Sequence, residues 1–185
     1  MIIPPVSEWT FGSIVELHNN NAKSVPLFYK RAPISVVVQD AFVPFEPSNF
    51  KEDSTRQNLV LSLSEPYDSA FDCFEAALVH VVTQRRLAFF GETEENDIID
   101  TYKAITRKQG EYPRGLRVKM STSGLYSTRF WDEQKMRIDP PEKFVGARVK
   151  ARVLLRAIWI GEDTWGIVAD CTDLQVKPCD VLCPF

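Results

Sequence analysis

The clearest chemical pattern in this chain is a row of cations that share one phase of an apolar stretch. Within residues 147–156 the row consists of Arg148, Lys150, Arg152 and Arg156, with Leu154 as its one apolar member, and the alternate positions are Ala, Val or Leu. Side chains of a β-strand point alternately to its two faces, so this spacing predicts a strand with one basic and one apolar face. Guanidinium and ammonium groups in such a row bind the phosphates of a polyanion.

The positive charge of the chain is concentrated around this stretch. Residues 101–156 hold fourteen Lys and Arg against five Asp and Glu, whereas residues 1–100 hold seven against fifteen and residues 157–185 hold one against five. The formal net charge of −3 therefore hides a local excess of nine positive charges. A basic surface on an otherwise acidic protein is typical of a face that binds a polyanion.

Two further predicted strands add cations and an aromatic side chain. Arg117 and Lys119 alternate with apolar residues, Arg129 shares the phase of Trp131, and Tyr126 lies close by in the sequence. Single-stranded nucleic acid is bound by cations that contact phosphates and by aromatic rings on which bases stack. The candidate DNA-binding residues are therefore Arg117, Lys119, Tyr126, Arg129, Trp131, Arg148, Lys150, Arg152 and Arg156.

Three other interpretations of this pattern stay open. The cations could simply solvate the outer face of an ordinary sheet, with Trp131 a core residue at a strand end. The basic face could instead bind an acidic protein partner, as a structural or interaction component of a virion or replication complex without direct DNA binding. A catalytic function, such as that of a nuclease, ranks behind both DNA binding and protein binding.

The basic strands lie in a pattern of strands interrupted by helices. Residues 34–42 and 59–63 read as strands, and a loop is expected from Pro44 to Asn58. From residue 68 the apolar period changes to 3.6, which predicts a first helix capped by Asp68 or Ser69 and ended by Gly91. A second helix is expected from Thr93 to Lys108. Alternation returns after Pro113, and a tight hairpin turn at 161–163 leads into the strand at 165–169.

This order of elements predicts a mainly β fold with a helical insert. We expect an OB-fold-like five-stranded barrel with two helices inserted between strands. The predicted organisation is an N-terminal extension at 1–32, an OB-fold single-stranded-DNA-binding domain at 33–177 with the helical insert at 68–108, and a C-terminal tail at 178–185.

The succession of these segments resembles the single-stranded-DNA-binding proteins of nucleocytoplasmic large DNA viruses, distant relatives of phage replication single-strand binders. The resemblance covers roughly residues 33 to 177. It is carried by residues 41–45, 59–63, 87–91, 112–119, 130–132, 146–151, 158–160 and 165–167. It implies an OB-fold core and sequence-independent binding of single-stranded DNA in viral DNA replication or recombination. We expect no enzymatic activity.

The C-terminus departs from what the resemblance implies. Replicative single-strand binders often end in an acidic tail closed by phenylalanine, which recruits replication proteins. This chain ends at Phe185 after Asp180, but the acidic run is absent. Docking of replication proteins through the tail and packing of the tail against the barrel both stay open, as does a homo-oligomer.

Other sites are weakly indicated. A zinc site from Cys171, Cys179 and Cys183 would need a fourth ligand, and the carboxylates between residues 92 and 100 fit a solvated helix start better than a metal cluster. No Walker or dinucleotide-binding glycine motif is present. We expect no cofactor and no metal. Without a membrane-spanning run or a signal-peptide pattern, we expect an intracellular protein that is not secreted and acts at the site of viral replication.

Overall fold

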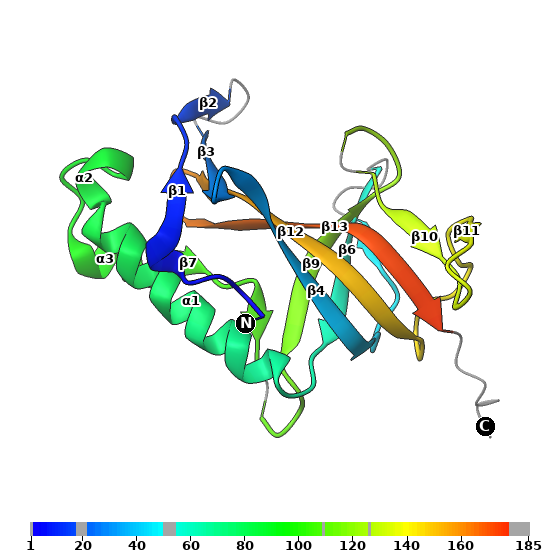
Figure 1. Ribbon diagram of the computed structural model, residues 1–185. Helices are drawn as coiled ribbons and strands as arrows, with labels where there is room; N and C mark the ends of the chain where they lie inside the picture. Colours follow the sequence, from blue (N-terminus) through cyan, green and yellow to red (C-terminus); the bar gives the residue numbers. More distant parts are fainter. Residues whose placement is uncertain (1, 18–21, 50–54, 109, 126, 178–185) are drawn as a thin grey trace.

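The computed structural model describes residues 2–17, 22–49, 55–108, 110–125 and 127–177. The candidate residue Tyr126 and the tail expected at 178–185 lie outside the described residues, as do Cys179 and Cys183. The described chain is mainly β with a helical insert, which confirms that part of the expected fold (Figure 1).

The elements follow one another in two blocks of strands separated by the helices. The first block is β1 (Trp9–Phe11), β2 (Val15–Leu17), β3 (Ala22–Tyr29), β4 (Ala32–Phe42), β5 (Ser48–Asn49) and β6 (Arg56–Ser62), preceded by a 3₁₀ turn at Val6–Glu8. The helices are α1 (Tyr67–Gln84), α2 (Arg86–Phe89) and α3 (Glu95–Asp100). The second block is β7 (Tyr102–Lys103), β8 (Thr106–Arg107), β9 (Gly115–Ser121), β10 (Arg129–Trp131), β11 (Arg137–Ile138), β12 (Arg148–Ile160) and β13 (Trp165–Lys177).

Five of these strands pair in a circuit that returns to its start. β4 pairs with β6, β6 with β9, β9 with β13, β13 with β12, and β12 again with β4. The β9–β13 pairing is parallel and the other four are antiparallel. Figure 1 shows α1 running across one end of this group of strands. The circuit brings strands from distant parts of the chain side by side.

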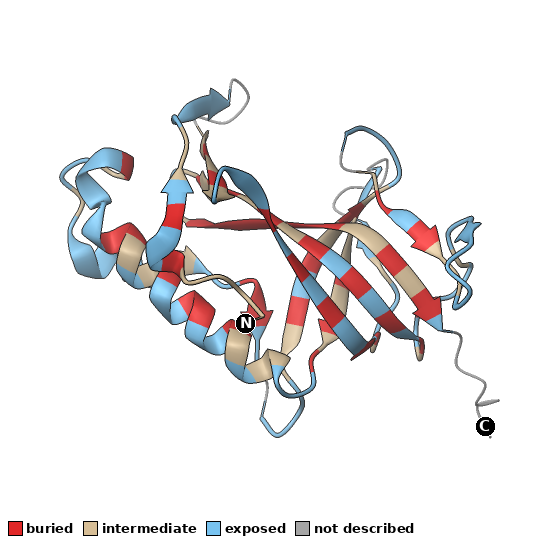
Figure 2. Ribbon diagram, viewed as in Figure 1, coloured by how far each residue is buried: buried red, intermediate tan, exposed pale blue. Residues whose placement is uncertain are grey.

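β12 shows the alternation that its sequence predicts. Val149, Ala151 and Val153 are buried, while Arg148 and Lys150 are exposed, and the same alternation is visible along the strand in Figure 2. The register against β13 shifts between Leu155 and Ala157, so an extra residue bulges there. Beyond this bulge the alternation changes phase, and Ala157, Ile158 and Ile160 are buried.

α1 buries one face against the strands. Phe71, Leu78 and Val82 are fully buried on that face, with Phe74 beside them. The helix begins at Tyr67, so the expectation of a cap at Asp68 or Ser69 is wrong. The carboxylate of Asp68 instead accepts a hydrogen bond from Arg114, a tertiary contact that competes with capping.

The second predicted helix is much shorter than expected. α3 ends at Asp100, and the residues that continue the helical period enter strands, because β7 pairs with the start of β13 (Tyr102 with Trp165). The ring centroids of these two aromatic residues are 4.7 Å apart. Tertiary pairing has overridden local helix propensity here. The described insert contains three helices rather than two, because α2 forms a separate short turn.

The segment expected as an N-terminal extension contributes strands to the same sheet. β3 pairs with the end of β12 and with the start of β4, and β1 and β2 pair with β3. Trp9 is buried and its ring lies 5.5 Å from that of Phe74 on α1. Trp9 of β1 therefore helps to cover the helical insert.

Candidate nucleic-acid interface

The candidate DNA-binding residues are divided between two surfaces. Arg117, Lys119 and Arg156 line a hollow of about 890 Å³. A second hollow, of about 700 Å³, adjoins it, and the two share Ala104, Ile105 and Arg117. We call these two adjoining hollows the groove.

One half of the groove is cationic. Strands β6, β7, β9 and β12 each contribute at least one basic side chain to it, and the indole of Trp159 lies among them. These side chains come from distant parts of the chain, and the pairings of β6 with β9 and of β9 with β13 bring them together. The cations of this half are Arg56, Lys103, Arg117, Lys119 and Arg156.

The other half of the groove is apolar and aromatic. Phe42, Phe45 and Tyr112 line it, and they are 40%, 66% and 75% exposed. Arg107 and Arg117 lie in the same wall. Exposed apolar side chains gathered in one hollow beside polar groups indicate a binding site, and aromatic rings beside cations can stack on nucleic-acid bases.

Trp159 is held in place by a close approach of the backbone. A Cβ atom on Gly166 would come within 2.8 Å of the carbonyl oxygen of Lys103 and 3.1 Å of Nε1 of Trp159. Only glycine therefore lets β7 and the indole pack this closely against β13. Trp165, at the start of β13, lies fully buried against Phe90 and Tyr102.

The wall formed by residues 102–107 is fixed to α1 by a buried carboxylate. Oε1 of Glu75 accepts hydrogen bonds from the Tyr102 hydroxyl and from the Ile105 backbone N–H, both at 2.8 Å. Its Oε2 accepts a hydrogen bond from the Thr106 hydroxyl. Burial, with the neighbouring carboxylate, raises the pKa of Tyr102 well above its usual value, so this phenol stays protonated and donates.

Arg114 ties the same wall to the start of α1. Its Nε and Nη2 atoms lie 2.8 Å and 2.6 Å from carboxylate oxygens of Asp68 and Asp72. Its Nη1 also donates a hydrogen bond to the Thr106 hydroxyl. The hydrogen bond from Arg114 holds the pKa of Asp68 below its usual value. The helical insert thus positions the aromatic end of the groove.

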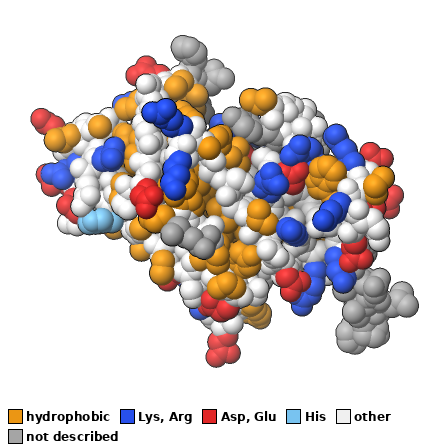
Figure 3. Space-filling model, viewed as in Figure 1, with side chains coloured by type: hydrophobic (Ala, Val, Ile, Leu, Met, Phe, Trp, Pro, Cys, Tyr) orange, Lys and Arg blue, Asp and Glu red, His pale blue; other side chains and the backbone are white. Residues whose placement is uncertain are grey.

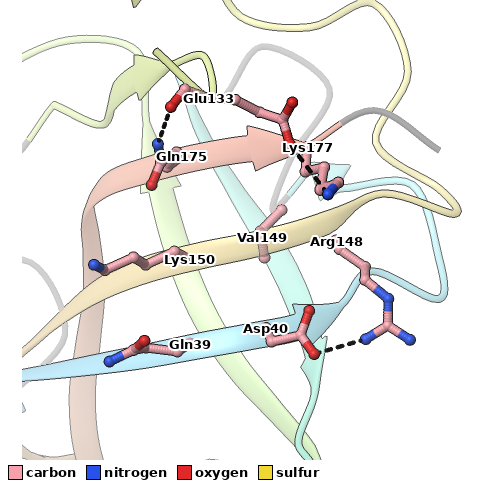
Figure 4. Close-up of a pocket in the computed structure, with 8 residues that line it drawn as sticks. All are labelled: Gln39, Asp40, Glu133, Arg148, Val149, Lys150, Gln175 and Lys177. Carbon is pink, nitrogen blue, oxygen red and sulfur yellow. Dashed lines mark hydrogen bonds and ion pairs between the residues drawn. The ribbon is translucent and has the colours of Figure 1, made fainter. Parts of the chain in front are cut away.

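The outer surface of β10 and β12 carries the remaining candidates, which are Arg129, Trp131, Arg148, Lys150 and Arg152. We call this the outer basic surface. Arg148 pairs with Asp40 of β4 at 3.0 Å, and Lys150 lies beside it on the same strand (Figure 4). In Figure 3 basic and acidic side chains are interspersed over this part of the molecule, so much of its positive charge is already balanced.

Asp173 on β13 joins three of these residues. Its carboxylate lies 2.9 Å from Nε of Arg129 and 3.6 Å from Nε of Arg152, and it accepts a hydrogen bond from the Trp131 indole at 3.1 Å. Burial acts to raise the pKa of Asp173, but hydrogen bonds from Arg129 and Trp131 outweigh it and leave the pKa lowered. Trp131 is only partly exposed, and its polar edge is occupied by this carboxylate.

Sequence reasoning missed several groove residues. Arg56, Lys103 and Arg107 were not candidates, because their strands pair across long sequence separations or are only two residues long, and Tyr112 lies in the loop between β8 and β9. The signal for Tyr112 was its place in an exposed Tyr-Pro pair before a strand. Phe42 carried no such signal, because it has the sequence phase of the buried residues Ile34, Val36 and Val38, and a register shift between Val38 and Ala41 turns it outward.

Metal and membrane sites are not indicated within the part of the chain that the structure describes. No group of three His, Cys, Asp or Glu side chains there could hold a metal ion, and no helix there is long and apolar enough to cross a membrane. Cys171, one of the three cysteines considered for zinc, is buried among the core strands, and burial raises the pKa of its thiol to about 12.

Comparisons with known proteins identify similar structures but no similar sequence. No protein-family model and no curated protein matches the chain. The single-stranded DNA-binding protein gp2.5 of bacteriophage T7 is similar, with a TM-score of 0.54 and 13% identity over 82% of this chain and 90% of that one. The single-stranded DNA-binding protein of bacteriophage Enc34, solved in complex with single-stranded DNA, has a TM-score of 0.51 and 11% identity over 84% and 92%. The chain therefore shares the fold of these phage proteins.

Proposed function

We propose that this protein binds single-stranded DNA without sequence preference and that the groove is the path of the strand. The observation that carries the proposal is the continuous groove, which places cations from four strands beside three exposed aromatic side chains. Cations contact the phosphates and aromatic rings stack on the bases, and neither contact depends on base identity.

The proposal includes an OB-type barrel as the scaffold. The five-strand circuit, with one parallel pairing between β9 and β13, supports a small closed or partly closed barrel. Two structures of similar fold are named as phage single-stranded DNA-binding proteins, and one of them was solved with single-stranded DNA. The second observation supports a non-enzymatic single-stranded-DNA binder over a protein-docking module.

The biological setting is part of the proposal. We place the protein in viral DNA replication or recombination inside the host cell, in keeping with its resemblance to the binders of nucleocytoplasmic large DNA viruses. Replication proteins would be its partners, with the C-terminal tail as the docking segment, and a homo-oligomer stays open. The outer basic surface remains a second candidate contact for DNA.

The test is a titration by fluorescence anisotropy with labelled oligonucleotides of single-stranded DNA, duplex DNA and RNA. We expect preference for single-stranded DNA and a log-log salt slope of about −0.7 for each phosphate contacted, measured between about 50 and 200 mM salt. Equal affinity for duplex, or affinity that does not change with salt, would contradict the proposal. Binding to none of the three would favour an acidic protein partner.

A further inference from the structure

Of the four tryptophans, all of which the structure describes, Trp159 alone lines the groove. The indole N–H groups of the other three donate to protein oxygens, at 2.6 Å in Trp165, 3.1 Å in Trp131 and 3.2 Å in Trp9. Within the described residues the Trp159 N–H has no acceptor, and no buried side-chain nitrogen or oxygen there lacks a partner. The Trp159 N–H is therefore accessible from the groove.

The neighbours of Trp159 across the sheet have small side chains. Trp159 of β12 pairs with Ser24 of β3 on one side and with Gly166 of β13 on the other. Directly paired residues of neighbouring strands point to the same face of a sheet, and Ser24 lines the same hollow as Trp159. The indole therefore has no bulky side chain beside it on either adjoining strand.

Two glycines let the indole lie close to the backbone of the β12–β13 hairpin. A Cβ atom on Gly166 would lie 3.2 Å from Cε2 of Trp159, and one on Gly161 would lie 3.6 Å from Cζ3. The two atoms belong to opposite sides of the six-membered ring, so the ring is supported along its length. A side chain held in this way has little freedom left to lose when a ligand binds.

The indole is not covered by another ring. The rings of Trp9 and Trp165 each pack on an aromatic neighbour, at 5.5 Å and 4.7 Å, whereas no aromatic ring of the described chain packs on Trp159. Trp159 is partly exposed in the hollow. A tryptophan that is fixed, partly exposed and unstacked has the properties of a platform for a nucleic-acid base.

A cation lies on the same row of the sheet. Gly166 pairs with Lys103 of β7, so Lys103 is two strands from Trp159, at about 10 Å from the strand spacing of about 4.8 Å. Lys103 is exposed and lines the same hollow. A base on the indole would therefore have its backbone phosphates near a cation.

We propose that Trp159 is a base-stacking residue in the cationic half of the groove. This inference rests on the proposed function and adds a stacking position to those of the aromatic half. The strand is then held by its bases in both halves of the groove, and the Trp159 N–H donates to an oxygen of the bound nucleotide. Stacking on an indole does not depend on base identity, because every base has a π-face.

The decisive measurement compares two single strands of the same length, one of thymidines and one of abasic deoxyribose phosphates. The abasic strand keeps the phosphates but has no base to stack. In anisotropy titrations at low salt, Trp159→Ala should weaken binding of the thymidine strand by about 5- to 150-fold, the range for one stacked base. Its binding of the abasic strand should equal that of wild type, because the cations are retained. A merely structural change would weaken both strands equally.

Tryptophan fluorescence gives a second measurement, which decides the matter if Trp159→Ala does not fold. Trp9 and Trp165 are buried and Trp131 lies on the outer basic surface, so the thymidine strand should quench the wild-type emission through Trp159. The quenching should be lost in Trp159→Phe and retained in the matched control Trp131→Phe. Because phenylalanine keeps a ring that can stack, Trp159→Phe should bind more tightly than Trp159→Ala. Circular dichroism establishes which variants are folded.

The outcomes separate this inference from the proposed function. Wild type that binds the thymidine strand, with folded Trp159→Ala that binds it equally well or loses both strands equally, would exclude stacking on Trp159 and leave the groove proposal standing. Quenching that persists in Trp159→Phe would exclude it too. If wild type binds neither strand, the proposed function fails and this inference fails with it.

Discussion

The side chain of Glu75 on α1 accepts a hydrogen bond at 2.8 Å from the hydroxyl of Tyr102 on β7. The same carboxylate accepts from the backbone N–H of Ile105, which lines both halves of the groove. The helical insert is thus connected to the groove wall by one buried acidic group. The helical insert therefore positions the groove wall and also covers one end of the strands.

Glu75→Ala should therefore impair both stability and binding. It leaves the Ile105 N–H and the hydroxyls of Tyr102 and Thr106 without their acceptor in a buried place, at a cost of about 3 kcal/mol in the free energy of unfolding. Urea unfolding measures the loss. Glu92→Ala, at an exposed carboxylate of the same insert, is the control and should change stability by less than about 0.5 kcal/mol. A loss of that small size in Glu75→Ala would mean that the wall does not depend on this residue.

The aromatic half of the groove predicts a stacking contribution. Phe45→Ala and Tyr112→Ala should each weaken single-stranded DNA binding by about 1 to 3 kcal/mol if one base stacks there. Both residues are more than half exposed, so the fold should be retained. Leu87→Ala on α2 removes an equally exposed apolar side chain outside the groove and should leave affinity unchanged. Unchanged affinity in both aromatic variants would exclude stacking at this end.

Substitutions on the two faces of β12 should differ in their effect on the stability of the protein. Val153→Ala removes fully buried packing and should cost about 1 kcal/mol or more of stability. Lys150→Glu on the exposed face should change stability by less than about 0.5 kcal/mol. Thermal unfolding of the two variants is the check. Unfolding caused by Lys150→Glu would mean that the strand's phase has been assigned wrongly.

The Arg114–Asp68 pair predicts acid sensitivity. Because the hydrogen bond from Arg114 keeps the pKa of Asp68 below its unfolded value of about 3.9, the pair stabilises the folded state above that pH. That contribution is lost as pH falls through the lower folded pKa. Urea unfolding of wild type should show falling stability below about pH 4, and Arg114→Gln should show a shallower fall. Parallel pH profiles for the two proteins would show that the pair contributes nothing.

The sequence predicted the local pattern of the fold better than the site. Alternation predicted β12 and its two faces correctly, because the period of a strand depends only on neighbouring residues. The helical period ran past Asp100 in the sequence, but pairing of Tyr102 with Trp165 ends the helix, and no local signal marks that contact. Arg117 and Arg152 carry the same alternating pattern, yet they face different surfaces. Which cations meet in one groove depends on strand pairings between distant segments.

The most direct test of the groove compares two triple charge reversals of equal size. Lys103, Arg107 and Arg117 are exposed cations of the groove, and Arg148, Lys150 and Arg152 are exposed cations of the outer basic surface. Changing each set to Glu alters the net charge equally, so long-range electrostatics affects both variants alike. In anisotropy titrations with single-stranded DNA, we predict a loss of more than about 100-fold for the groove variant and a much smaller loss for the other. An equal loss in both, or a larger loss for the outer basic surface, would contradict the assignment of the groove as the DNA path.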